Sequence, residues 1–378
     1  MNHPNFMPYM KYSIILIVLF SVLNGQRPGD IEVRQGVDAF YNYEHAKSIK
    51  ILTQAREDYP EHPGVHVAWA AAHWRHNEAN LTIEEVYTNF ENHLAEIVTV
   101  YDSLVAKYPN DPEYQLYQGT AKGLKARIFL GQKKWIPTLV SAYQGFRIVQ
   151  VAHRIDTTIT DAYLPIGIVE YYAGMSNLLV KAGAEMFGLN PSKGEGIRKM
   201  EITATRSQWA WTESMSILSF IYQFIDVDQE RALKYSEKLS KKYPRNFDFQ
   251  VHYAFSLIQT SDLKRVKKQL DQLNQRLDRL GPRHQKLYTA YLEYLWGHYY
   301  FLKGEEDKAM GFLDKCIELY NAELDAFLAN AYLLQGMILD KKKDRMGAVI
   351  AYKKCIKLDN HIHAISLARQ YLDEPFQG

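Results

Sequence analysis

The chain has 378 residues, of which 47% are hydrophobic and 23% charged, values typical of a folded protein that exclude a disordered chain. Its 45 basic and 43 acidic side chains give a formal net charge of +2, and this balance argues against a general binder of nucleic acid or of anionic membranes. The 27 tyrosines and 6 tryptophans are many for this length, and such side chains both fill helix cores and line binding grooves.

Residues 1–25 predict a secretory signal peptide. Lys11 precedes a run of about ten apolar residues, 14–23, and Asn24-Gly25-Gln26 follows that run. A membrane span needs about 20 apolar residues, so a signal fits the run better. We therefore expect an exported protein, periplasmic or extracellular at the cell envelope, whose mature chain begins near Gln26. An uncleaved membrane anchor is the alternative.

After this segment the chain predicts helices only, because no stretch keeps the period-two alternation of a strand. A Tyr-Pro tag recurs at 59–60, 108–109 and 243–244, each time after a charged amphipathic helix. Proline cannot continue a helix, so each tag predicts the end of the second helix of a pair. Residues 161–174 predict a first helix, and residues 135–154 predict the second helix of the preceding pair.

Residues 175–193 form an insertion where a turn of a few residues would join two helices. Four apolar side chains within it would be costly to leave in water, namely Leu178, Leu179, Met186 and Phe187. We interpret the insertion as a partner-binding surface, with contact to a membrane surface as a further use. The alternative is that it folds back over residues 163–172 and completes the local core.

Apolar residues recur at steps of three and four from Leu263 to Leu280, and Gly281-Pro282 then stops the helix. The stripe covers fewer than three heptads, so we expect a helix packed within the protein. A dimerising coiled coil and a basic binding helix are the alternatives.

One two-helix pattern appears twice in register between residues 293 and 360. It places a glycine, an alanine and a cysteine at matching positions, which are Gly297, Ala309, Cys316, and then Gly336, Ala348, Cys355. The offset from glycine to alanine predicts two helices joined by a turn, with a small residue on each helix where the backbones approach. The cysteines occupy equivalent positions on neighbouring helices, so we expect two free, buried thiols too far apart for a disulfide.

This pattern resembles the tetratricopeptide repeat, with Glu293 where that repeat usually has Trp and Gln335 where it usually has Leu. The resemblance implies an all-α protein, an α-solenoid of about eight helix-turn-helix repeats that fills residues 26–378 as a single domain. The stretch from Ile362 to Leu372 predicts a C-terminal helix that caps the stack. Proteins of this family bind other molecules in a concave groove, and the chain is similar to uncharacterised bacterial envelope proteins built from such repeats.

Tyr291, Tyr294, His298 and Phe301 lie at steps of three, four and three, and so share one face of a first helix. In the family that this chain resembles, first helices line the groove, so we expect this stripe to contact a partner. Burial of the stripe by the adjacent repeat is the alternative. Glu170 is a further candidate, because a carboxylate among apolar residues must be paired or protonated. It either bonds to a tyrosine or arginine of the next helix or contacts a ligand.

No motif in the sequence predicts catalysis. There is no phosphate-binding loop after a strand, no His-Glu-x-x-His zinc motif and no Gly-x-Ser-x-Gly elbow. His62, His66, His73 and His76 lie close together, but no cysteine or well-placed carboxylate joins them, so we expect no metal site. We expect no cofactor and no enzymatic activity.

The sequence therefore favours a non-enzymatic scaffold, exported to the cell envelope, that binds a protein or peptide partner in its concave groove. The alternative is an envelope protein that binds a small molecule or a glycan on the same aromatic groove. Neither interpretation involves nucleic acid.

Overall fold

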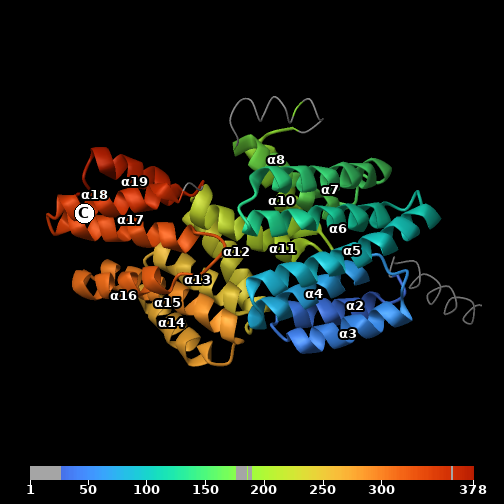
Figure 1. Ribbon diagram of the computed structural model, residues 1–378, viewed down its shortest axis with the longest axis horizontal. Coiled ribbons are helices and arrows are strands. Elements are labelled where there is room, and N and C mark those ends of the chain that lie inside the picture. The colour runs from blue at the N-terminus through green and yellow to red at the C-terminus, as the bar shows by residue number, and fades with distance from the viewer. Residues whose placement is uncertain (1–26, 176–184, 186–189, 359–360) are drawn as a thin grey trace, which may run out of the picture.

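The computed structural model describes residues 27–175, 185, 190–358 and 361–378, and within them it contains 17 α-helices and no strand. These helices form eight consecutive pairs and a final helix, α19 (His363–Asp373), which closes the stack (Figure 1). The predicted all-α solenoid with a terminal capping helix is confirmed. The predicted signal peptide, and Leu178, Leu179, Met186 and Phe187 of the insertion, lie outside the described residues.

The first helices of the eight pairs are α2 (Asp30–Tyr41), α4 (Val65–Asn80), α6 (Pro112–Gly131), α8 (Tyr163–Met175), α11 (Trp211–Phe220), α13 (Phe247–Gln259), α15 (Pro282–Leu302) and α17 (Ala326–Lys341). The second helices are α3 (His45–Asp58), α5 (Ile83–Lys107), α7 (Trp135–Ile155), α10 (Lys193–Arg206), α12 (Gln229–Lys242), α14 (Leu263–Leu277), α16 (Glu306–Leu319) and α18 (Arg345–Lys357). A short 3-10 helix, η1 (Thr160–Ala162), precedes α8, and α11 ends in a π-helical turn, η2 (Ile221–Ile225). No helix in the described ranges is long and apolar enough to cross a membrane.

Each predicted Tyr-Pro tag ends a second helix. Tyr59, Tyr108 and Tyr243 follow α3, α5 and α12, with φ of −131°, −128° and −123° and ψ of 60°, 63° and 72°. The backbone N–H of each tyrosine donates to the carbonyl oxygen four residues earlier, at 2.8 to 2.9 Å. The proline that follows has no N–H to extend the helix, so the chain leaves all three helices with the same backbone conformation.

The turn inside a pair also repeats. In five pairs, one residue between the two helices has a φ between 55° and 73°, and these residues are Tyr43, Lys133, Ser261, Gly304 and Lys343. This left-handed conformation costs a non-glycine residue roughly 1–2 kcal/mol. Only Gly304 adopts it without that cost, so the packing of the paired helices must offset it in the other four turns.

Glycines mark points where paired helices touch. A Cβ on Gly297 of α15 would lie 2.9 Å from a side-chain carbon of Leu313 on α16, in the pair where the sequence predicts close approach. A Cβ on Gly145 of α7 would lie 2.5 Å from the carbonyl oxygen of Gly119 on α6. Contacts this short leave no room for a side chain, so the close approach of these backbones depends on glycine.

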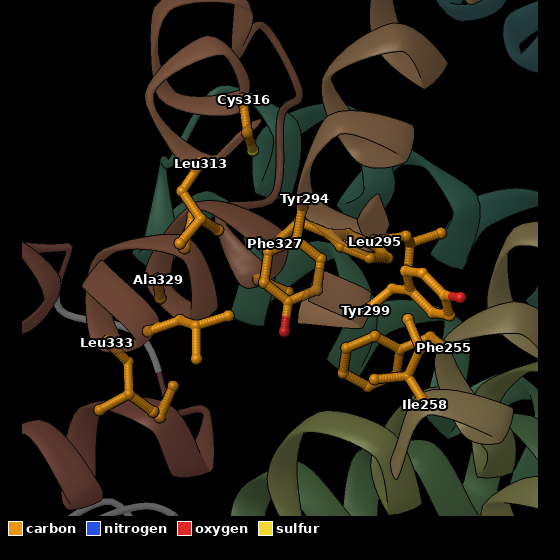
Figure 2. Packing of buried hydrophobic residues seen from close by; sticks show 14 of the residues in the cluster. Phe255, Ile258, Tyr294, Leu295, Tyr299, Leu313, Cys316, Phe327, Ala329 and Leu333 are labelled. Atoms are coloured by element: carbon orange, nitrogen blue, oxygen red, sulfur yellow. The ribbon is translucent and has the colours of Figure 1, made fainter. Parts of the chain in front are cut away.

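The largest hydrophobic core runs from η2 to α19 (Figure 2). Phe255 of α13, Tyr294 of α15 and Phe327 of α17 meet within it, with ring centroids 5.5 to 6.0 Å apart. Val266 and Leu270 of α14 have no exposed surface, so the apolar stripe on this helix packs within the array, as predicted.

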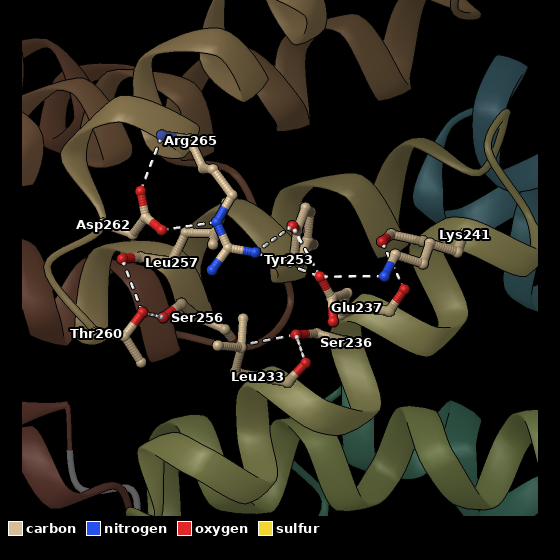
Figure 3. Close-up of polar contacts among 11 residues, drawn as sticks. Leu233, Ser236, Glu237, Lys241, Tyr253, Ser256, Leu257, Thr260, Asp262 and Arg265 are labelled. Atoms are coloured by element: carbon tan, nitrogen blue, oxygen red, sulfur yellow. Dashed lines mark hydrogen bonds and ion pairs between the residues drawn. The ribbon is translucent and has the colours of Figure 1, made fainter.

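The second helices carry exposed charge networks. Figure 3 shows Arg265 of α14 beside Asp262, with Nε 2.6 Å from Oδ2, and beside Glu237 of α12, with Nη1 3.3 Å from Oε1. Exposed ion pairs typically contribute about 0–1 kcal/mol, so these networks add little to the stability of the fold.

The array closes on itself, because its early pairs contact its late pairs. Helix α4 packs against α15 (Figure 1). The Arg283 guanidinium of α15 donates to the carbonyl oxygen of Glu78 on α4 at 3.2 Å. Glu323, in the loop before α17, forms an ion pair with Arg127 of α6 at 2.6 Å. First helices that are distant in the sequence therefore come into direct contact.

Candidate binding site at the closure of the array

Five polar side chains from different helix pairs gather where α4 packs against α15. Tyr43 comes from the turn after α2, Arg75 from α4, Glu213 from α11, Asp248 from α13 and Tyr288 from α15. We call these five residues the closure site. Up to 245 positions separate them along the chain, so only the contact between distant pairs brings them together.

A chain of hydrogen bonds runs through the closure site. The hydroxyl of Tyr43 lies 2.7 Å from the hydroxyl of Tyr288, which in turn donates to Asp248 Oδ1 at 3.2 Å. Because the proton of Tyr288 points to Asp248, Tyr43 is the donor in the first bond. Burial raises the pKa of both tyrosines, so both keep their protons at neutral pH.

Arg75 is the cation of the closure site. Its Nη1 donates to Oε2 of Glu78, one turn further along α4, at 2.6 Å. Burial disfavours the charged form of both groups, but their pairing outweighs burial, so the pKa of Arg75 is raised and the pKa of Glu78 is lowered. The side chain of Arg75 is still 38% exposed, so it is open to solvent in part.

Glu213 is reached by solvent and yet is partly desolvated. The residue is exposed, and its Oε2 accepts a hydrogen bond from the Tyr41 hydroxyl at 3.5 Å. Burial by the surrounding helices raises the pKa of its carboxyl, while Arg75 opposes this rise and Asp248 adds to it. Ionisable groups with shifted pKa values are typical of functional sites.

The π-helical turn η2 borders the closure site. Its Gln223 lies against α13, where Oε1 is 2.5 Å from Nδ1 of His252. The other ring nitrogen of His252, Nε2, lies 3.9 Å from Asp248 Oδ2. Burial lowers the pKa of His252, and Asp248 opposes that change. Such π-turns are frequent at functional sites, and this one links a histidine to a carboxylate of the closure site.

The predicted aromatic stripe on α15 packs largely within the array. Tyr294 is 1% exposed, and Tyr291 stacks on Phe327 of the next pair with ring centroids 4.2 Å apart. The hydroxyl of Tyr294 lies 3.0 Å from Nδ1 of His298, and burial lowers the pKa of His298 to about 4. Phe301 is half-buried. The adjacent repeat thus covers Tyr294, whereas Tyr291, His298 and Phe301 keep partly exposed surface.

Glu170 has its partner within its own helix pair. Its carboxylate forms a buried ion pair with Lys199 of α10, and the Glu170 residue is 5% exposed. The partner is a lysine, where the sequence suggested a tyrosine or arginine of the next helix. A paired, buried carboxylate of this kind needs no ligand to satisfy it.

The clustered histidines take part in hydrogen bonds of the protein. His62 Nε2 lies 2.8 Å from Asp30 Oδ1, and His66 Nε2 lies 2.8 Å from the carbonyl oxygen of Pro60. The described part of the chain contains no group of three or more residues placed to hold a metal ion. Cys316 is free and buried, as is Cys355, and burial raises the pKa of each thiol to about 12.

The sequence alone did not reveal the closure site. The one signal in the sequence was a charged residue within an apolar first helix, the feature that also singled out Glu170. Arg75 follows the mostly apolar stretch 67–74, and Glu213 follows Trp211-Thr212, so both fit that description. Nothing in the sequence indicated that the two would meet.

No protein-family model matches the chain, and no curated protein matches it in sequence. Similar solved structures include a tetratricopeptide repeat protein from Parabacteroides merdae, at 12% identity and a TM-score of 0.44, over 77% of this chain and 96% of that chain. The human IFIT1 dimer with m7Gppp-AAAA matches at 11% identity and a TM-score of 0.42, over 95% of this chain and 86% of that chain. Yeast Tom70 matches at 11% identity and a TM-score of 0.28, over 90% of this chain and 95% of that chain. Likenesses this weak identify no functional residue in this chain.

Proposed function

We propose that this chain is a non-enzymatic helical-repeat scaffold that binds a protein or peptide partner at the closure site. The observation that carries the proposal is a pair of opposite charges open to solvent at this site, the 38% exposed side chain of Arg75 on α4 and the exposed Glu213 on α11.

The charges of the closure site suit a segment that carries both a carboxylate and hydrogen-bond donors. The Arg75 guanidinium can hold a carboxylate through two parallel N–H···O bonds. Glu213 can accept a backbone amide or an ammonium group of the same segment. Because these two side chains stand on α4 and α11, a bound segment would touch an early and a middle pair at once.

A binding measurement with a matched control tests this proposal. The mature chain is used to capture its partner from the envelope fraction of its host, and peptides of that partner are then titrated by fluorescence anisotropy. We expect Glu213→Gln to weaken binding at least tenfold without loss of stability, while Glu237→Gln, on the exposed network of Figure 3, binds like the parent. Equal binding by Glu213→Gln would contradict the proposal.

We also propose that the protein is exported to the cell envelope, on the basis of residues 1–25. The N-terminus of the protein recovered from that fraction should lie near Gln26. A chain that still carries Lys11 would contradict cleavage, and its recovery only from the cytosol would contradict export.

A further inference from the structure

A pocket of about 310 Å³ opens between α14, α15 and α16. It lies on the face of α15 that is turned away from Tyr291, since Tyr291 packs on Phe327 of α17 whereas Trp296 packs near Phe312 of α16. Its lining combines three aromatic rings with three polar side chains, namely Trp296, Tyr300, Phe312, Asn274, Thr289 and Glu293. A concave site with apolar walls and a few polar groups is the usual form of a small-ligand site.

Glu293 carries the polar group at the pocket that has no hydrogen-bond partner. Its Oε2 is buried and accepts no hydrogen bond. Burial raises the pKa of this carboxyl, and Lys315 opposes the rise. Buried polar atoms are normally hydrogen-bonded, so an orphan acceptor beside a cavity points to a donor that is supplied by a ligand. The residue also stands where the resembling repeat usually has Trp, so a packing side chain is replaced by an acceptor.

The three rings lie nearly parallel to one another. Tyr300 and Phe312 stack with centroids 5.3 Å apart and planes at 13°. The ring of Trp296 lies 6.3 Å from Phe312 with planes at 27°. The three rings thus form one stacked apolar cluster at the pocket, with Glu293 beside them.

Three lysines lie near the rings of the pocket. Lys267 Nζ is 6.0 Å from the ring centroid of Trp296, Lys308 Nζ is 5.2 Å from that of Tyr300, and Lys315 Nζ is 5.8 Å from that of Phe312. Two of them also form ion pairs, Lys267 with Asp271 and Lys308 with Glu305. The faces of aromatic rings attract cations, and here the protein supplies its own. A cationic ligand would meet these ammonium groups, so a neutral ligand fits better.

We propose that this pocket binds one sugar ring of a carbohydrate. The apolar C–H face of the ring would lie against the wall formed by Trp296, Tyr300 and Phe312. Ring hydroxyls would donate to the Glu293 carboxylate and exchange hydrogen bonds with Asn274 and Thr289. The closure site lies on other helices, so this inference does not depend on the partner proposed above.

Ligand-observed saturation-transfer NMR on the full mature chain tests the proposal. The probes are methyl β-D-glucopyranoside, N-acetyl-D-glucosamine and D-glucuronic acid, and tetramethylammonium is the cationic probe. We expect at least one of the sugars to bind, and we expect tetramethylammonium not to displace it. Binding of tetramethylammonium alone, or of none of the four probes, overturns the proposal.

Two variants locate the binding. Glu293→Leu should abolish the sugar signal and raise the melting temperature, because it removes a half-buried carboxyl with one unsatisfied oxygen while keeping most of the side-chain volume. Trp296→Phe should weaken binding at least threefold while keeping an aromatic wall. The exposed Glu318→Gln on α16 is the control and should bind like the parent. Sugar binding that survives Glu293→Leu unchanged overturns the assignment to this pocket.

Discussion

The hydroxyl of Tyr43 donates to the hydroxyl of Tyr288 at 2.7 Å, which joins the first turn of the array to the first helix of its seventh pair. Tyr43 makes this contact from a left-handed backbone with a φ of 61°. That conformation costs a bulky residue roughly 1–2 kcal/mol, so the tertiary contact of this tyrosine helps to offset a local strain.

We predict that Tyr43→Phe lowers the free energy of unfolding by about 0.5–1.5 kcal/mol, since it removes the donor of a buried hydrogen bond. A double-mutant cycle with Tyr288→Phe, measured by urea denaturation, separates the direct contact from other effects of each substitution. The coupling energy should be about 1 kcal/mol. Additive effects of the two substitutions would mean that the contact does not form in solution.

We predict that Glu323→Gln weakens the closure of the array. Glu323 pairs with Arg127 at 2.6 Å and with Arg283 at 3.6 Å, and its side chain is 12% exposed. Loss of the Glu323 charge should lower the free energy of unfolding by about 1–3 kcal/mol. It should also increase the radius of gyration measured by small-angle scattering. As the control, Lys133→Gln removes an ion pair whose lysine side chain is 60% exposed, and it should lower the free energy of unfolding by less than about 1 kcal/mol. Equal effects of both variants would contradict a specific role for Glu323.

Gly145→Ala should destabilise the third pair of helices by about 1–3 kcal/mol, because a new Cβ would lie 2.5 Å from the carbonyl oxygen of Gly119 and backbone atoms cannot move aside. Gly311→Ala on α16 is the matched control, since no atom lies within 4 Å of the Cβ added there. The free energy of unfolding of Gly311→Ala should rise by up to about 1 kcal/mol, because alanine has a higher helix propensity than glycine. Thermal unfolding of the two variants, compared with the parent, measures both effects.

Stability should fall as the pH is lowered from 6.5 to about 4. Burial lowers the pKa of His66, His73 and His298 to about 4, from an ordinary value of 6.5. In this window the unfolded chain binds protons that the folded chain does not, so the contribution of these histidines is complete above pH 6.5 and is lost as the pH falls.

Urea midpoints at pH 7.0, 5.5 and 4.5 measure this dependence. We expect His298→Gln to make the decline shallower, whereas His363→Gln, which changes an exposed histidine of the capping helix, should leave it unchanged. A parent protein whose midpoint stays constant over this range would show that the three rings are accessible to protons in the folded state.

The helix pairs could be predicted because their signals are local. The Tyr59-Pro60 tag and the offset from Gly297 to Ala309 each act within one pair, and the structure has a helix end and a close helix contact at those places. The role of Tyr294 could not be predicted in this way. The same spacing places a residue on a groove face or against the next repeat, and only the position of Phe327 decides between the two.

No such local signal predicts the closure site. Arg75 and Glu213 belong to helices whose periodicity concerns their own pair, and the contact between α4 and α15 depends on the small rotation that every repeat adds to the stack. A rotation accumulated over several repeats has no counterpart in any single stretch of sequence.

A linear stack of repeats loses stability piece by piece, because each repeat depends only on its neighbours. In this chain the pairing of α4 with α15 and of Arg127 with Glu323 turns the stack into a closed loop of contacts. Removal of the last two pairs would therefore take support from the second and third pairs as well. A protease cut between α14 and α15 should release no folded N-terminal fragment, and the whole molecule should unfold in a single cooperative transition.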